Sequence, residues 1–157
     1  MNPDDIFLTR AIELALQGSR QGDGGPFGAI IVHEGRIIGE AWNRVVASKD
    51  PTAHAEIAAI RMACASLGHF HLSGCVLYAS SEPCPMCLSA AYWARIGRIV
   101  FANSRAEAAA IGFCDDDLYA ELNRTLTERS IVMEHRALPG ALQPMREWSG
   151  NPQRTPY

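Results

Sequence analysis

The stretch Phe27–Trp42, FGAIIVHEGRIIGEAW, decides the fold. Its two β-rich runs, Phe27–Val32 and Arg36–Trp42, flank a short connection at residues 33–35 that contains a glycine. Runs of this kind joined by a short turn are typical of a β-hairpin. The sequence therefore predicts two paired strands at this point in the chain.

Helical and strand patterns continue on both sides of this hairpin. Before it, Pro3 stands at a plausible first helical position, and apolar residues then repeat at helical spacing up to Gly18. After it, helix and strand patterns alternate. We expect helices at His54–Leu67, Pro85–Arg95, Arg105–Ile111, Asp117–Asn123 and Ala141–Trp148, and strands at Cys75–Ala79, Arg98–Phe101 and Ile131–His135.

This order of elements predicts an α/β fold. Strands that alternate with helices pair in parallel, while the hairpin adds antiparallel pairing. We therefore expect a three-layer α/β/α architecture with a five-stranded mixed sheet. At 157 residues the chain is close to the common domain size of about 100–150 residues, so residues 1–157 are expected to form a single domain.

Composition excludes several classes of protein. No apolar run approaches the ~18 residues of a membrane span, which excludes a transmembrane protein. The acidic start, Met1–Asp5, has neither the basic region nor the cleavage site of a secretory signal, so we expect a cytoplasmic location. The net charge of −3 argues against a general nucleic-acid binder. Five cysteines in a reducing compartment indicate metal binding or catalysis rather than disulfides.

The strongest functional pattern pairs residues 54–56, HAE, with residues 83–87, PCPMC. His54, Cys84 and Cys87 are the nitrogen and sulfur ligands that zinc prefers. A site with three protein ligands leaves a fourth position for water, which is typical of catalytic zinc. A structural zinc site would need a fourth His or Cys beside either half, and neither half has one. We therefore expect one catalytic zinc ion per subunit.

Glu56 is the expected proton carrier beside this zinc. It lies two residues after the ligand His54, close enough to reach a bound water without being a ligand itself. Zinc lowers the pKa of such a water to about 7. A carboxylate in this place can take the proton and deliver it to a ring nitrogen and then to a leaving amine.

Five motifs resemble the cytidine-deaminase-like superfamily, and within it the small bacterial guanine deaminases. The H-x-E and P-C-x-x-C pair is the signature of zinc nucleobase deaminases. Three of the motifs are also similar to those of tRNA adenosine deaminases, whereas the last two and the C-terminal tyrosine resemble guanine deaminases. In order, the motifs are PFGA (26–29), DPTAHAE (50–56), EPCPMCL (82–88), YWAR (92–95) and GF (112–113) followed by acidic residues.

The resemblance implies roles for polar residues outside the zinc site. Asn43 resembles the amide that recognises the base, with a turn-forming residue as the alternative. Asp115 resembles the carboxylate that holds the guanine edge. Cys114 stands where a second acid often follows Gly-Phe, which leaves Asp116 as the alternative to Asp115.

The resemblance also implies an enclosed pocket. Phe27 and Trp93 would supply its walls, with core packing as the alternative, and His54 would border the substrate. The segment 137–157 would close the site, with Tyr157 over the purine, in its own or in a neighbouring subunit.

By this resemblance the reaction is the zinc-dependent hydrolysis of guanine to xanthine and ammonia, a step of purine salvage. Guanosine, the amino-triazine ammeline and tRNA adenosine are alternative substrates. The expected partners are a small-molecule purine and a second copy of the chain in a homodimer, with exchange of the C-terminal segments between subunits as an alternative arrangement. We expect no membrane and no nucleic-acid partner.

Overall fold

The computed structural model describes residues 2–157, whose contacts divide the chain into two compact units. The larger unit extends to Leu118 and contains all the strands found in the described residues. The smaller unit, Tyr119–Tyr157, contains only helical and irregular segments. Helix α6 (Asp115–Leu122) crosses the boundary between them.

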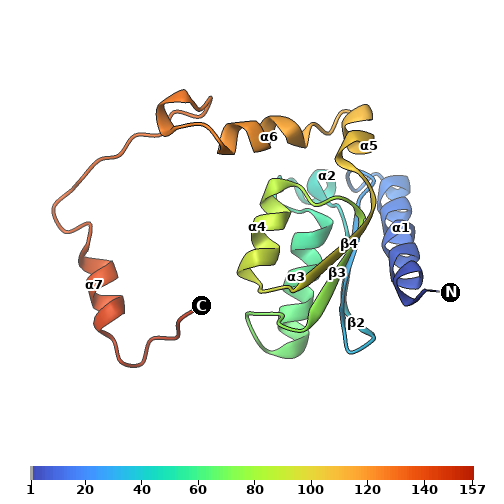
Figure 1. The fold of residues 1–157 in the computed structure, drawn as a ribbon, viewed down its shortest axis with the longest axis horizontal. Coiled ribbons are helices and arrows are strands. Elements are labelled where there is room, and N and C mark those ends of the chain that lie inside the picture. Colours follow the sequence, from blue (N-terminus) through green and yellow to red (C-terminus); the bar gives the residue numbers. More distant parts are fainter. Residues whose placement is uncertain (1) are drawn as a thin grey trace. The chain divides into compact units, whose positions relative to one another are not determined.

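A mixed sheet of four strands, in the order β2-β1-β3-β4, forms the centre of the larger unit (Figure 1). Strand β1 (Gly28–His33) pairs antiparallel with β2 (Arg36–Trp42) and with β3 (Cys75–Ser81). Strand β3 pairs in parallel with β4 (Arg98–Asn103). The predicted hairpin and the mixture of pairings are confirmed.

The predicted count of five strands is wrong, because the segment Ile131–His135 forms no strand. Its apolar residues Ile131 and Val132 are 76% and 80% exposed. An alternating pattern becomes a strand only where a neighbouring strand pairs with its backbone N–H and C=O groups. This segment pairs with no strand of the described chain.

Helices cover both faces of the sheet. Helix α1 (Pro3–Gln21) lies on one face, and α3 (Ala55–Leu67) and α4 (Pro85–Trp93) lie on the other (Figure 1). Gly22 and Gly68, both in the left-handed conformation that glycine adopts without strain, end α1 and α3. Three of the predicted helices therefore begin and end close to the predicted residues.

Strand β1 divides the core into two halves. Its side chains alternate, so that Ile30 and Val32 pack with Leu14 of α1 while Ala29 and Ile31 pack on the side of α3 and α4. All five residues are buried. The continuous apolar run of β1 thus reflects a sheet that is covered on both faces.

Close packing of α3 on the sheet fixes the position of its first turn. A side chain at Gly39 of β2 would place its Cβ 2.4 Å from the carbonyl oxygen of Ala59 in α3, so only glycine allows this approach. The helix therefore lies directly against β2 and presents its N-terminal end at the edge of the sheet.

The remaining helices are short. The predicted helices after residue 104 are confirmed near their expected positions, and an unpredicted turn of helix lies in the loop after β2. None of the described helices has the length and apolar character needed to cross a membrane. These elements are α2 (Val45–Ser48), α5 (Arg105–Ala110), α6, a 3-10 turn (Leu126–Glu128) and α7 (Gln143–Gly150).

Candidate active site

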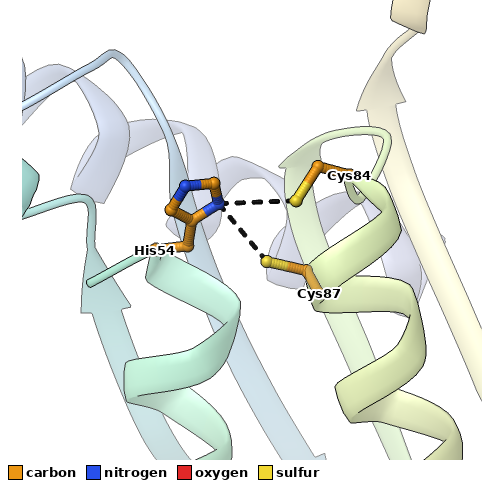
Figure 2. A group of neighbouring side chains, drawn as sticks. All are labelled: His54, Cys84 and Cys87. Carbon is orange, nitrogen blue, oxygen red and sulfur yellow. Dashed lines mark hydrogen bonds between the residues drawn. The ribbon is translucent and has the colours of Figure 1, made fainter. Parts of the chain in front are cut away.

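Two helix N-termini bring the predicted zinc ligands together. His54 is the residue that caps α3, and Cys84 is the residue that caps α4, with Cys87 in the first turn of that helix. Figure 2 shows the imidazole directed at both sulfur atoms. Helix N-termini carry positive partial charge, which favours the thiolate form of both cysteines.

The three donor atoms fit a zinc ion. The Nδ1 atom of His54 lies 3.5 Å from the Sγ atoms of both Cys84 and Cys87 (Figure 2). Zinc bonds of about 2.0–2.3 Å in tetrahedral directions would place a nitrogen and a sulfur ligand about 3.6 Å apart. No fourth His, Cys, Asp or Glu joins this group among the described residues. The donor set therefore leaves one position for water or substrate.

The cysteine pair has the chemistry of a metal site. The neighbouring Cys87 thiol, followed by His54, lowers the pKa of Cys84 to about 4, so Cys84 is a thiolate at neutral pH. The same interaction raises the pKa of Cys87. A bound zinc ion would stabilise both as thiolates.

Glu56 lies in the first turn of α3 and is only 7% exposed. Burial raises the pKa of its carboxyl above the usual range for glutamate. A carboxyl that holds a proton more tightly than usual can both accept a proton from water and donate it to a substrate near neutral pH. The location and the environment of Glu56 thus suit the predicted proton carrier.

A pocket opens over this group. All of the residues that line it belong to the larger unit. It contains two zinc ligands, the buried glutamate, two aromatic rings and two further acids. The lining residues are Phe27, His54, Glu56, Ser81, Glu82, Cys84, Ala108, Phe113 and Asp115.

Phe27 and Phe113 form the apolar wall of the pocket. Their ring centroids lie 4.8 Å apart, with the planes at 88° in an edge-to-face arrangement. Phe27 was predicted as a wall, whereas Phe113 was quoted only as part of the Gly-Phe motif. Glu82, directly before the PCPMC motif, was also missed as a lining residue. The adjacency of both to recognised motifs was the available signal.

Asn43 lies beside the pocket but outside its lining. Its side chain is 4% exposed, and its Oδ1 atom accepts hydrogen bonds of 3.2 Å from the backbone N–H groups of Gly25 and Val45. The backbone N–H of Asn43 donates a hydrogen bond of 2.9 Å to the carbonyl oxygen of Phe27. The amide oxygen thus has the turn-forming role, which leaves the amide NH₂ as the group that a substrate could use.

The two candidate acids point in different directions. Asp115 lines the pocket, and burial raises the pKa of its carboxyl. The side chain of Asp116 is 77% exposed and its Oδ1 atom lies 3.2 Å from Nη1 of Arg105. The structure therefore places Asp115, and not Asp116, at the site.

Trp93 and Tyr157 are not brought to this pocket within the larger unit. Trp93 lies at the end of α4 opposite Cys84, roughly 13 Å along the helix axis, and it is 70% exposed. Core packing, the alternative for Trp93, does not occur in one chain either. Tyr157 belongs to the smaller unit, so its role over the purine stays a prediction.

Comparison with known proteins agrees with this geometry. Residues 1–103 match the family model of the cytidine and deoxycytidylate deaminase zinc-binding region. The chain is 46% identical to guanine deaminase from Bacillus subtilis over 153 residues, 98% of each protein. The crystal structure of a B. subtilis guanine deaminase superposes with a TM-score of 0.95 over 98% of each chain. A tRNA-specific adenosine deaminase from Haemophilus influenzae is 39% identical over 83% of this chain and 76% of its own length.

Proposed function

Because this chain belongs to the cytidine and deoxycytidylate deaminase zinc-binding family, we propose that it hydrolyses guanine to xanthine and ammonia. The observation that carries the proposal is the meeting of His54, Cys84 and Cys87 at a pocket that is also lined by the buried Glu56. The similarity to guanine deaminase over 98% of the chain supports guanine as the substrate.

Proton transfer is the task of Glu56 in this proposal. A zinc ion held by His54, Cys84 and Cys87 would supply Lewis-acid activation of the attacking water. The Glu56 carboxylate accepts a proton from that water as its oxygen bonds to the carbon that bears the amine. It then donates that proton to the adjacent ring nitrogen. The remaining proton of the added hydroxyl group passes to the amine as the C–N bond breaks and the C=O bond forms. Water and guanine are thereby converted into xanthine and ammonia.

Recognition of the purine would use the other pocket residues. The rings of Phe27 and Phe113 give the flat base an apolar surface. The Asp115 carboxylate can accept a hydrogen bond from a guanine N–H group, and the Asn43 amide can donate to a carbonyl or ring nitrogen. His54 borders the same space. These complementary groups support a purine that carries both donors and acceptors.

We further propose that the chain forms a homodimer with one zinc ion in each subunit. Tyr92 and Trp93, on the exposed surface of α4, are 77% and 70% exposed, and such neighbouring aromatic residues are typical of an interface. Segment 137–157 would close a pocket, its own or its neighbour's, with Tyr157 over the base. Trp93 would border a pocket only where α4 of one chain adjoins the site of another.

A cytoplasmic location and a place in purine salvage complete the proposal. The cysteines at the candidate zinc site must stay reduced to bind the metal, which a reducing compartment ensures. Hydrolysis of a free base to xanthine belongs with the breakdown and recycling of purines.

A substrate panel tests this function. Ammonia release by the zinc-loaded protein is measured with guanine, guanosine, adenosine, cytosine, ammeline and a tRNA anticodon stem-loop. We expect the highest kcat/KM with guanine. A higher kcat/KM with guanosine or ammeline would contradict guanine as the substrate but would leave hydrolytic deamination as the reaction.

The 39% sequence identity to a tRNA-specific adenosine deaminase makes tRNA adenosine the second candidate substrate. A tRNA substrate needs a basic surface for its phosphates. The sequence offers scattered arginines for it near the C-terminus. Tight, salt-dependent binding of the stem-loop with adenosine turnover would favour this candidate. The arginines concerned are Arg129, Arg136, Arg146 and Arg154.

A further inference from the structure

Arg105 lies between two carboxylates at the rim of the pocket. Its Nε atom is 3.3 Å from Oε1 of Glu82, and its Nη1 atom is 3.2 Å from Oδ1 of Asp116. Its backbone N–H also donates to Oε2 of Glu82 at 3.0 Å. One guanidinium thus bridges two acids that are distant in the sequence.

The two acids adjoin the two functional parts of the site. Glu82 lines the pocket and precedes the zinc ligand Cys84 by two residues. Asp116 follows the pocket acid Asp115 in the first turn of α6. The side chains of Arg105 and Glu82 are only 35% and 24% exposed, so water screens this half of the bridge less than it would on an open surface. The bridge therefore connects the metal-binding segment to the start of α6.

The ion pair between Arg105 and Asp116 bears on which of the two neighbouring acids faces the pocket. Consecutive residues on a helix point about 100° apart, and here Asp115 lines the pocket while Asp116 contacts Arg105. While Arg105 holds Asp116 on the outer side, Asp115 is directed inward. We propose that Arg105 is a positioning residue that fixes the orientation of α6 and thereby keeps Asp115 aimed at the purine. This inference rests on the proposed function.

A double-mutant cycle tests whether Arg105 acts through Asp115. Guanine binding is measured by calorimetry on zinc-loaded protein carrying Glu56→Gln, which prevents turnover. Arg105→Ala is expected to raise the Kd for guanine about tenfold, a typical size for loss of a coupled polar interaction. In a protein that also carries Asp115→Asn, the same change is expected to alter Kd less than twofold. Additive effects in the two backgrounds would overturn the proposal.

Further variants separate positioning from general damage. Arg105→Lys keeps the charge but loses the guanidinium fork, so we expect an intermediate Kd. Asp116→Ala, at an exposed side chain, breaks only the outer half of the bridge and is expected to weaken binding less than Arg105→Ala. Arg36→Ala, at an exposed arginine at the start of β2, is the matched control and should leave Kd unchanged. Stronger loss with Asp116→Ala than with Asp115→Asn would overturn the proposal.

Amide hydrogen exchange gives a readout that does not need guanine. Arg105→Ala should accelerate exchange in α6 several-fold without loss of zinc or of the main thermal transition. Unchanged exchange in α6 would contradict the positioning role. If the unsubstituted pocket binds no guanine, the proposed function fails, and the exchange of α6 still decides what Arg105 does. If Arg105→Ala does not fold, Asp116→Ala provides the same comparison.

Discussion

The two units of the chain differ in the burial of their apolar side chains. Residues of the larger unit bury theirs on both faces of a sheet, with Leu14, Ile31 and Leu77 almost inaccessible to water. No described residue of Tyr119–Tyr157 is buried by the packing of that unit itself, although the segment carries several large apolar residues. The larger unit thus has its own core and all the residues that line the pocket. The smaller unit has apolar surface that only another surface could cover.

The largest effect is expected at the buried candidate zinc ligand Cys87. Cys87→Ala removes one of three donors, so bound zinc and at least ~99.9% of guanine turnover should be lost. Metal content measured by atomic absorption, together with ammonia release, checks this. Ala at the exposed Cys114 is the matched control and should retain zinc. A Cys87→Ala protein that binds zinc as tightly as the unsubstituted chain would contradict the assigned ligand set.

The second prediction compares the loss of unfolding free energy caused by one substitution in each unit. Leu77→Ala empties part of the core and should cost about 2–5 kcal/mol of unfolding free energy. Val132→Ala, at a side chain 80% exposed in one chain, should cost less than about 0.5 kcal/mol if that exposure persists in solution. Denaturant unfolding of both variants measures the difference. A cost above about 1 kcal/mol for Val132→Ala would mean that the assembled protein buries the smaller unit.

Tyr157 tests whether the smaller unit serves the site. Tyr157→Ala should raise KM for guanine about tenfold, since a stacked aromatic ring contributes about 1–3 kcal/mol to the binding of a base. Zinc content should not change. Steady-state kinetics checks this, with Tyr157→Phe retaining most of the affinity because it keeps the ring. Unchanged kinetics in Tyr157→Ala would remove the terminal residue from the site.

The smallest effect is expected at Asp4, which does not line the pocket. Asp4 accepts hydrogen bonds from Tyr78 and Arg98, and chiefly Arg98 lowers its pKa from 3.8 to about 2. Because the folded pKa is the lower one, the stabilisation is complete above pH 3.8 and disappears as the pH falls through 2. Asp4→Asn should therefore lower Tm at pH 6 and converge with the parent near pH 2. Parallel Tm curves over that range would contradict the assignment.

How far the sequence predicted the molecule depends on whether its patterns are local. The meeting of His54, Cys84 and Cys87 could be predicted because short motifs place these residues on two helix starts, and the structure brings these starts together. The hairpin and the helices followed from periodicity. Segment Ile131–His135 has the same kind of alternation, but it has no strand to pair with. Periodicity cannot report a missing partner.

The other misses have a similar physical origin. Phe113 reaches the pocket through a turn, so no repeat in the sequence marked it. Asp115 lines the pocket and Asp116 pairs with Arg105, eleven residues away, and this pairing cannot be read from the sequence around either acid. Trp93 stands in a recognised motif, but helix length places it far from Cys84. The motifs therefore indicated which residue types belong to the candidate site better than they indicated how far each residue lies from the pocket.

The central claim is that the pocket over His54, Cys84 and Cys87 deaminates guanine with Glu56 as proton carrier. The direct measurement compares ammonia and xanthine formation from guanine by the zinc-loaded protein and by its Glu56→Gln variant. We predict turnover by the first and a loss of about 10²–10⁴-fold or more in the second, with zinc content and Tm retained. Equal turnover by the two proteins, or none by the unsubstituted one, would contradict the account.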